Sequence, residues 1–202
     1  MENCVFCNID KIRHDILFDS DNFFIKVGVG ILAPGHVMIV SKQHLSCFGE
    51  LPKELIEEFS LIKEVAFEKI KSNFSEPIIY EHGIYGQSVK HAHLHFIPAN
   101  TKHYKLENIK EKFFTNLKST RIKDMNDLIR IFQKEGSYLY LEEKGKKWVY
   151  HTSGHPEIKS LFRKEFARVT GIKGLLDWQA MVDEDKEKNN EWINLTKEFL
   201  QR

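Results

Sequence analysis

One stretch predicts the fold of this chain: Gly86-Gln87-Ser88-Val89-Lys90-His91-Ala92-His93-Leu94-His95-Phe96-Ile97-Pro98. Three histidines alternate here with apolar residues, and a period of two is the pattern of a strand that is buried on one face. We expect the apolar residues to enter the core and the histidines to line the opposite face. Because imidazole titrates near neutral pH, such a row suits metal binding, proton transfer or phosphoryl chemistry. The alternatives are a plain metal site and a histidine-rich strand with no function.

A second motif lies upstream, Pro34-Gly35-His36-Val37-Met38-Ile39-Val40, a tight turn that leads into an apolar strand. Together, the Pro-Gly-His turn, Gly86-Gln87-Ser88-Val89, the three histidines and Pro98 resemble the histidine triad (HIT) superfamily over about residues 1–100. We therefore expect an α+β fold, with an antiparallel sheet of about five strands and a long helix packed against it. The long helix is predicted after Pro52, where apolar residues recur at helical spacing: Leu55, Phe59, Ile62, Ala66 and Ile70.

The resemblance implies a catalytic set of His93, His95, His91 and His36. In HIT enzymes the middle histidine attacks the α-phosphate of a nucleotide derivative, and water then resolves the nucleotidyl-histidine intermediate. His93 takes that role here. His91 would orient His93 through its backbone carbonyl, and His95 would contact the phosphate or the bridging oxygen. His36 would lie behind the triad and influence its tautomers. The alternative is that His36 is only a structural residue of the turn.

The same resemblance assigns four residues to nucleotide and phosphate binding: Gln87, Ser88, Phe6 and Ile9. One position departs from the family pattern. Familiar HIT enzymes carry Asp or Asn eight residues before the histidine of the Pro-Gly-His turn, where it binds the ribose hydroxyls, and this chain has Gly28 there. A glycine has no side chain for those hydrogen bonds, so a neighbouring side chain must replace them or ribose recognition is weak. Glu81 and His82, just before the triad, read either as surface residues or as contacts to ribose or leaving group.

Cys4 and Cys7 form a Cys-x-x-Cys pair at the N-terminus. Such a pair is a redox couple, half of a zinc site or two ordinary buried thiols. Zinc needs about four ligands, so two more would have to come from elsewhere. By resemblance to zinc-containing HIT proteins, Cys4, Cys7, His44 and His91 would form a structural zinc site that fixes the N-terminus to the sheet. Cys47 is the alternative ligand.

Composition bounds the possible partners. The chain has 202 residues, 42% hydrophobic and 29% charged, with a net charge of +1. This balance gives no electrostatic reason to expect nucleic acid or a membrane as a partner. Three cysteines are too few for a disulfide scaffold, and the N-terminus lacks the features of a signal peptide, so a cytoplasmic location is expected. A homodimer remains open.

Residues 101–202 lie outside the minimal HIT unit and resemble, less specifically, longer HIT-like proteins with a C-terminal extension. We expect this extension to be α-rich, to contain a hairpin around Lys144-Gly145 and to pack on the HIT core. Helices are predicted over 124–135, from Pro156 to Gly171, and near 187–200, with 183–188 as a linker or helix start. Lys159 and Arg163 could reach a phosphate from the second of these helices, although charged helix faces are usually only solvated.

These observations lead to a nucleotide hydrolase or nucleotidyl transferase of the HIT type as the predicted function. The expected substrate is a phosphoanhydride or phosphoramidate derivative of a purine nucleotide, such as a dinucleoside polyphosphate. Two alternatives stay open: a nucleotide-binding or partner-binding module with little turnover, and a zinc-stabilised interaction domain with no nucleotide pocket.

Overall fold

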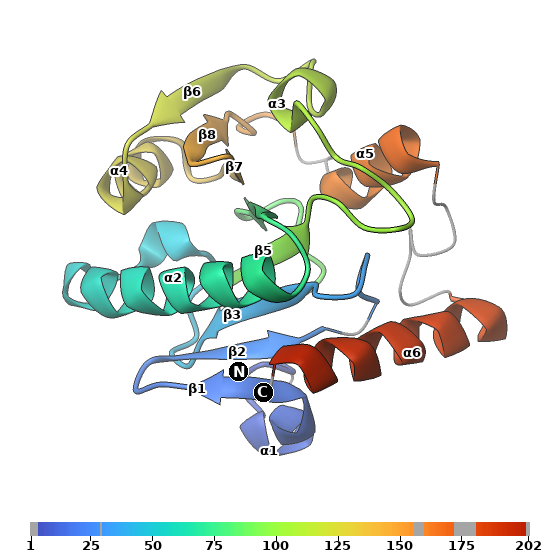
Figure 1. Ribbon diagram of the computed structural model, residues 1–202. Coiled ribbons are helices and arrows are strands. Elements are labelled where there is room, and N and C mark those ends of the chain that lie inside the picture. Colours follow the sequence, from blue (N-terminus) through green and yellow to red (C-terminus); the bar gives the residue numbers. More distant parts are fainter. Residues whose placement is uncertain (1–3, 29, 156–159, 172–180, 201–202) are drawn as a thin grey trace.

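The computed structural model describes residues 4–28, 30–155, 160–171 and 181–200. One antiparallel sheet runs through it in the order β1-β2-β3-β5-β4-β7-β8-β6 (Figure 1). Its strands are β1 (Ile16–Asp19), β2 (Phe23–Val27), β3 (Val37–Ser41), β4 (Pro77–His82), β5 (His93–Pro98), β6 (Ser119–Ile122), β7 (Leu139–Glu143) and β8 (Lys146–Tyr150). The helices are α1 (Ile9–Ile12), α2 (Ile56–Asn73), α3 (Ile109–Lys112), α4 (Met125–Glu135), α5 (Leu161–Thr170) and α6 (Asp183–Leu200). The α+β class is thus confirmed.

The sheet is larger than predicted, because it has eight strands where about five were expected. Strands β1 to β5 come from the first hundred residues, and β7 pairs with β4 to continue the sheet into β8 and β6. Tyr80 of β4 lies opposite Leu141 of β7, for example. The alternating pattern of a strand indicates which face is buried but not which strand lies beside it, so the sequence did not predict this junction.

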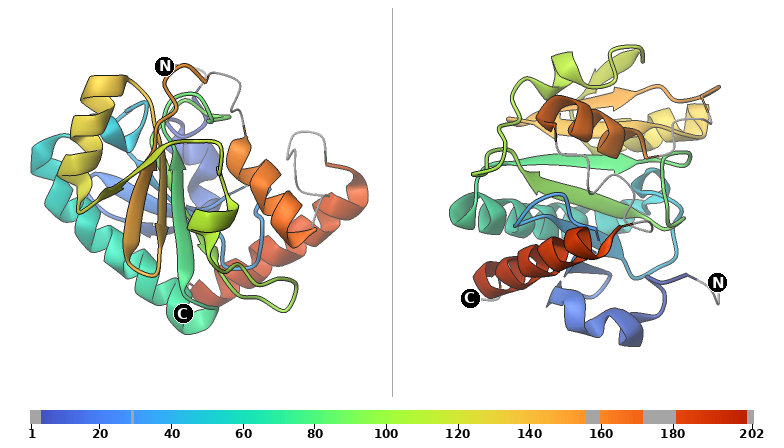
Figure 2. Two further views of the ribbon diagram at one scale, coloured as in Figure 1. Left: turned by 90° about the horizontal axis from the view of Figure 1, so that it is seen from above. Right: turned by 90° about the vertical axis from the view of Figure 1, so that its right-hand side faces the viewer.

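The two faces of the sheet are covered by different helices (Figure 2). Ile79 and Tyr80 are neighbours in β4 and therefore point to opposite faces. Ile79 lies with residues of α2 and Asp124 and Met125 at the start of α4 around one cavity. Tyr80 stacks on Phe162 of α5, with ring centroids 3.6 Å apart. The histidines share the Tyr80 face, so α5, and not α2, lies over the candidate site.

Helix α2 confirms the predicted long helix. Four residues of the predicted stripe are buried, namely Phe59, Ile62, Ala66 and Ile70, and Leu55 is partly buried just before the helix. Pro52 precedes a short 3₁₀ turn, η3 (Lys53–Leu55), that runs into the helix.

The Pro-Gly-His turn needs its glycine. Gly35 has a φ of +85°, in the left-handed region that favours glycine. A Cβ there would lie 2.7 Å from the ring of Phe74 and 2.8 Å from Pro98, so any side chain would also clash. The backbone N–H of Gly35 donates to Thr196 Oγ1 of α6 at 2.8 Å. The turn that delivers His36 to the sheet is therefore packed on both sides.

Helix α6 also holds the loop between β2 and β3. The buried amide of Asn189 accepts from Gly30 N and donates to Ile31 O, both at 3.1 Å. The helix begins at Asp183, so the charged run 183–188 is a helix start and not a linker, and its first turn is acidic, as the helix dipole favours. The second half of the chain thus fixes the loop that leads to His36.

The other predicted elements of residues 101–202 are present where they are described. Helix α4 is capped by Asp124, whose side chain accepts from Asn126 N and Asp127 N, and it ends at Gly136. Strands β7 and β8 form the predicted hairpin. Helix α5 ends at Gly171, while its predicted start at Pro156 lies outside the described residues. No helix in the described ranges has both the length and the apolar character to cross a bilayer.

Candidate active site and metal site

Strand register places the predicted histidines in one row with residues of the neighbouring strands. His93 lies opposite Val40, and His95 lies between Met38 of β3 and Tyr80 of β4. Lys26 of β2 lies opposite Met38 on the other side. Since side chains of directly paired residues share a face, this row forms one wall of a site. His91 lies just before β5 and not within it.

His93 is held in one tautomer. Its Nδ1 lies 2.6 Å from the carbonyl oxygen of His91, so Nδ1 carries the proton and donates it to that oxygen. Nε2 therefore keeps its lone pair. Burial lowers the pKa of His93 to about 4, against a weaker rise from its hydrogen bond to His91 O. A neutral ring with a free nitrogen is the form that can act as a nucleophile.

His36 and His95 form a relay of hydrogen bonds that fixes both tautomers. The N–H of Leu32 donates to His36 Nδ1 at 2.9 Å, so the proton of His36 is on Nε2. That Nε2 donates to His95 Nδ1 at 3.0 Å, which places the proton of His95 on its own Nε2. Burial lowers the pKa of both rings well below the usual value. His95 thus presents a neutral N–H donor beside His93.

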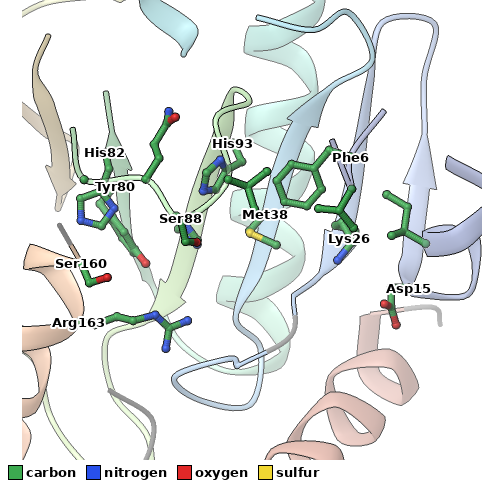
Figure 3. Close-up of a pocket in the computed structure, with 16 residues that line it drawn as sticks. Phe6, Asp15, Lys26, Met38, Tyr80, His82, Ser88, His93, Ser160 and Arg163 are labelled. Atoms are coloured by element: carbon green, nitrogen blue, oxygen red, sulfur yellow. The ribbon is translucent and has the colours of Figure 1, made fainter. Parts of the chain in front are cut away.

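A cavity of about 240 Å³ lies over this row (Figure 3). Of the site residues predicted from sequence, His93, His95, Gln87, Ser88 and Phe6 line it, and so do His82 and Arg163, which were named as possible ligand contacts. His36, His91 and Ile9 are not among its described lining residues; Ile9 packs instead in a small apolar cluster that contains Phe6 and Met38. Phe6 contacts the triad, with its ring centroid 5.5 Å from that of His93.

The side-chain amide of Gln87 is anchored at the cavity wall by the backbone. Its Nε2 donates to Ser46 O at 2.7 Å, and its buried Oε1 has no hydrogen-bond partner among the described residues. One of the two N–H donors of this amide is thus occupied by the protein.

Sequence reasoning did not find two charged lining residues, Asp15 and Lys26. Lys26 is 3% exposed, and its pKa is lowered to about 8 by burial, against the charge of Asp15. The sequence did contain a hint of this role, because Lys26 interrupts the otherwise apolar run 23–27. A lysine is rarely buried unless its charge is paired or has a function. At Gly28 a Cβ would come within 2.8 Å of Met38 Cε, so an acidic residue there would require Met38 to move. The carboxylate that the described cavity contains is Asp15.

Glu81 and His82 are both buried, so the alternative that they are surface residues is wrong. Glu81 is part of the scaffold: it accepts from Phe48 N at 2.8 Å and from the hydroxyl of Tyr138, and burial raises its pKa to about 8. His82 lines the cavity and accepts from Phe162 N at 3.2 Å through Nε2.

The predicted metal ligands Cys4, Cys7, His44 and His91 come together, with all four ligand atoms within 4.8 Å of one another. Cys4 Sγ and Cys7 Sγ lie 3.4 and 3.6 Å from His91 Nδ1, and Cys7 Sγ lies 3.1 Å from His44 Nδ1. Ligand atoms on a tetrahedral zinc are separated by roughly 3.3–3.8 Å, given the usual Zn–N and Zn–S bonds. His91 Nε2 donates to Ser41 O at 2.7 Å, which leaves Nδ1 unprotonated and fixes the ring, as metal-binding histidines require. The cluster is compatible with zinc.

The alternative ligand, Cys47, is not a member of this cluster. It is fully buried, and burial together with the charge of Glu81 raises the pKa of its thiol. Cys47 is therefore a core residue.

If the cluster holds a structural zinc, the purified protein should carry about one equivalent of the metal. Cys4→Ser with Cys7→Ser should abolish metal binding and lower the thermal midpoint by about 5–15 °C, because a structural metal stabilises only the folded state. Metal analysis and a thermal melt check this, with Cys47→Ala as the control that keeps its zinc. Metal-free protein with an unchanged midpoint would remove zinc from the account.

Comparison with known proteins identifies the class. The HIT domain family matches residues 10–102. "Protein hit" of Bacillus subtilis is 31% identical over 107 residues, which cover 48% of this chain and 71% of that protein. The chain belongs to the HIT family.

A second relative extends beyond the family match. "CWF19-like protein 1" of Xenopus laevis is 23% identical over 206 residues, which cover 97% of this chain but only 37% of that protein. The alignment thus includes most of residues 101–202, and this chain spans well under half of that relative. Among solved structures, a HIT family hydrolase from Clostridium thermocellum is 26% identical with a TM-score of 0.43, over 53% of this chain and 99% of that one.

Proposed function

We propose that this protein is a nucleotide hydrolase or nucleotidyl transferase of the HIT type that acts at the α-phosphate of a purine nucleotide derivative. One observation carries the proposal: the Nδ1–H of His93 is bound to the carbonyl of His91, so the free Nε2 belongs to a neutral ring on the cavity wall. Membership of the HIT family supports it.

In the first step His93 Nε2 forms a bond to the α-phosphorus, and the bond from phosphorus to the leaving group breaks. The leaving group takes the electron pair of that bond. In the second step the oxygen of water attacks the phosphorus, the N–P bond breaks, and its electron pair returns to Nε2 while a proton of water goes to solvent. In a transferase another hydroxyl would replace the water.

The other residues have distinct roles in this scheme. His95 donates its Nε2–H toward the phosphoryl or leaving-group oxygen, because Nδ1 is occupied by His36. Pre-oriented donors of this kind stabilise charge that develops in the transition state. Phe6, Met38 and Ile12 offer an apolar surface to a base, and Asp15 is placed to accept from ribose hydroxyls in place of a residue at position 28. The zinc cluster would hold Cys4 and Cys7, and with them Phe6, against the sheet.

The proposal is tested by trapping the intermediate. Protein mixed with a dinucleoside polyphosphate and denatured at alkaline pH should carry a nucleoside monophosphate on the peptide that contains His93, as seen by mass spectrometry. Turnover without any adduct would indicate direct attack by water. Nucleotide binding that stabilises the protein without turnover would favour the binding-module alternative.

A further inference from the structure

Lys26 is a buried charge on the wall of the cavity, and the proposed chemistry does not use it. Figure 3 shows it beside Phe6 and Met38. Its side chain is almost fully buried, and its pKa of about 8, lowered by burial, leaves the amine mostly protonated at pH 7. Moving such a charge out of water is unfavourable unless partner groups surround it. A residue of this kind in a cavity is therefore a candidate ligand contact.

The described partners of Lys26 occupy only part of its hydrogen-bonding capacity. An ammonium group has three N–H donors, and Lys26 Nζ donates one of them to the carbonyl oxygen of Val27. Asp15 attracts the charge from a distance: its carboxylate pairs with Lys197 of α6 at 2.8 Å, and among the described residues no direct ion pair joins Asp15 to Lys26. Two donors of the ammonium can thus serve a ligand.

The position of this ammonium indicates which part of a nucleotide it would meet. Neighbouring strands lie about 4.8 Å apart, so Lys26 on β2 is about 10 Å from His95 on β5, with Met38 of β3 between them. His93 lies farther along β5, and the bond to Val27 O keeps the ammonium beside β2. With the α-phosphate at His93, a group at this distance lies beyond the ribose and beside the base.

The ring of Phe6 connects the two positions. Its centroid lies 5.5 Å from that of the His93 ring, and Lys26 Nζ lies 5.9 Å from the same centroid. Phe6, Ile12 and Met38 supply apolar lining around these two groups. A base packed on this surface, with its phosphate at His93, would bring its edge to the ammonium. The apolar side chains would then contact the face of the base, and Lys26 would supply a donor at its edge.

The two common purines differ at the edge that such a donor would contact. Guanine presents two acceptors side by side, O6 and N7, whereas adenine presents N7 and an amino group that is itself a donor. An ammonium group has donors and no acceptor, so it can bind both acceptors of guanine but meets the amino group of adenine donor to donor. A charged donor that binds two acceptors also offsets part of the unfavourable free energy of its burial.

We propose that Lys26 binds the O6 and N7 edge of a guanine base, so that the site selects 6-oxopurine nucleotides over adenine nucleotides. The inference rests on the proposed function, which places the α-phosphate at His93, and it deepens that function by naming the base. Lys26 determines specificity in this scheme, and the bond to phosphorus is still made by His93.

The test measures the affinity of the full-length protein for GMP, IMP and AMP by titration calorimetry. IMP shares O6 and N7 with GMP but lacks its 2-amino group, so it isolates the edge that Lys26 would contact. Wild type should bind GMP and IMP about 10–100-fold more tightly than AMP, the range expected for one good set of base contacts. Lys26→Met should bind all three within about threefold of one another, with its affinity for AMP close to that of wild type.

Two further variants sharpen the comparison. Lys26→Gln should bind AMP as tightly as GMP or more tightly, because a glutamine amide pairs with N6 and N7 of adenine. Lys63→Met is the matched control. Lys63 is also a lysine with little exposure, but it pairs with Glu142 and lines the cavity on the opposite face of the sheet. Its replacement should preserve the preference for GMP and IMP, and retained binding of AMP shows that each variant is folded.

The outcomes distinguish this inference from the proposed function. If wild type turns over no nucleotide derivative yet shows the Lys26-dependent preference, the proposed function fails and the base site stands. If wild type binds the three nucleotides equally, or if Lys26→Met weakens all three alike, Lys26 does not read the base. Either result overturns the inference, even where His93 still forms the covalent adduct.

Discussion

Replacing His93 with asparagine should lower turnover by about 10⁴-fold or more, because asparagine lacks the ring nitrogen that would form the covalent intermediate. The expected loss follows from geometry: His93 Nε2 is free only because Nδ1 donates to His91 O at 2.6 Å. The amide of asparagine can still donate to that carbonyl but has no ring nitrogen to offer. Fold and binding of a product nucleotide should be close to unchanged, since the amide is polar and smaller than the ring. Steady-state kinetics and nucleotide titration check both expectations.

His95→Asn is the matched comparison. His95 stabilises charge without forming a bond to phosphorus, so its loss should cost roughly 10²–10⁴-fold. The variant should still form the adduct on His93, although more slowly. If His93→Asn keeps wild-type turnover while His95→Asn abolishes it, the nucleophile has been assigned to the wrong histidine. If neither change matters, the enzymatic proposal fails as well.

The second large effect is expected from removing the extension. A chain that ends at Asn100 should aggregate, because β4 loses β7 and becomes an uncovered edge next to an apolar surface. Tyr80 would also lose the stacked ring of Phe162, and the loop before His36 would lose Asn189 and Thr196. Size-exclusion chromatography with light scattering measures the outcome directly. We therefore propose that residues 101–202 are part of one folded unit with the HIT domain.

A milder variant distinguishes the effect of exposing the edge of β4 from the effect of losing the contacts to the loop before His36. The full-length double variant Asn189→Ala with Thr196→Ala keeps β7 on β4 but leaves the N–H groups of Gly30 and Gly35 without these partners. It should keep the oligomeric state of wild type and lose about 1–3 kcal/mol of stability for each site. A soluble, fully active fragment ending at Asn100 that does not aggregate would instead show that the extension is a separate module.

The sequence alone predicted those features of this chain that depend on residues close together in the sequence. The alternation in 91–96 predicted that His93 and His95 share one face of a strand, and the structure places both on the wall of the cavity. The Pro-Gly-His turn required a glycine, and Gly35 has a positive φ. These features are local, since a period of two or a left-handed turn is set by neighbouring residues. The four cysteine and histidine ligands came from resemblance to a family, and the structure brings their ligand atoms together.

Tertiary structure alone decided what surrounds the triad. Nothing near Asp15 or Lys26 in the sequence shows that they line one cavity with His93, and a charged helix face alone did not establish that Arg163 does. The pairing of β4 with β7, and hence an eight-stranded sheet in place of about five strands, was equally invisible. A strand records in its own residues which face is buried, but its partner is chosen by the packing of the whole chain. The sequence by itself therefore determined the class of the protein and the histidines of its proposed chemistry, and tertiary packing decided which distant charges line the cavity beside them.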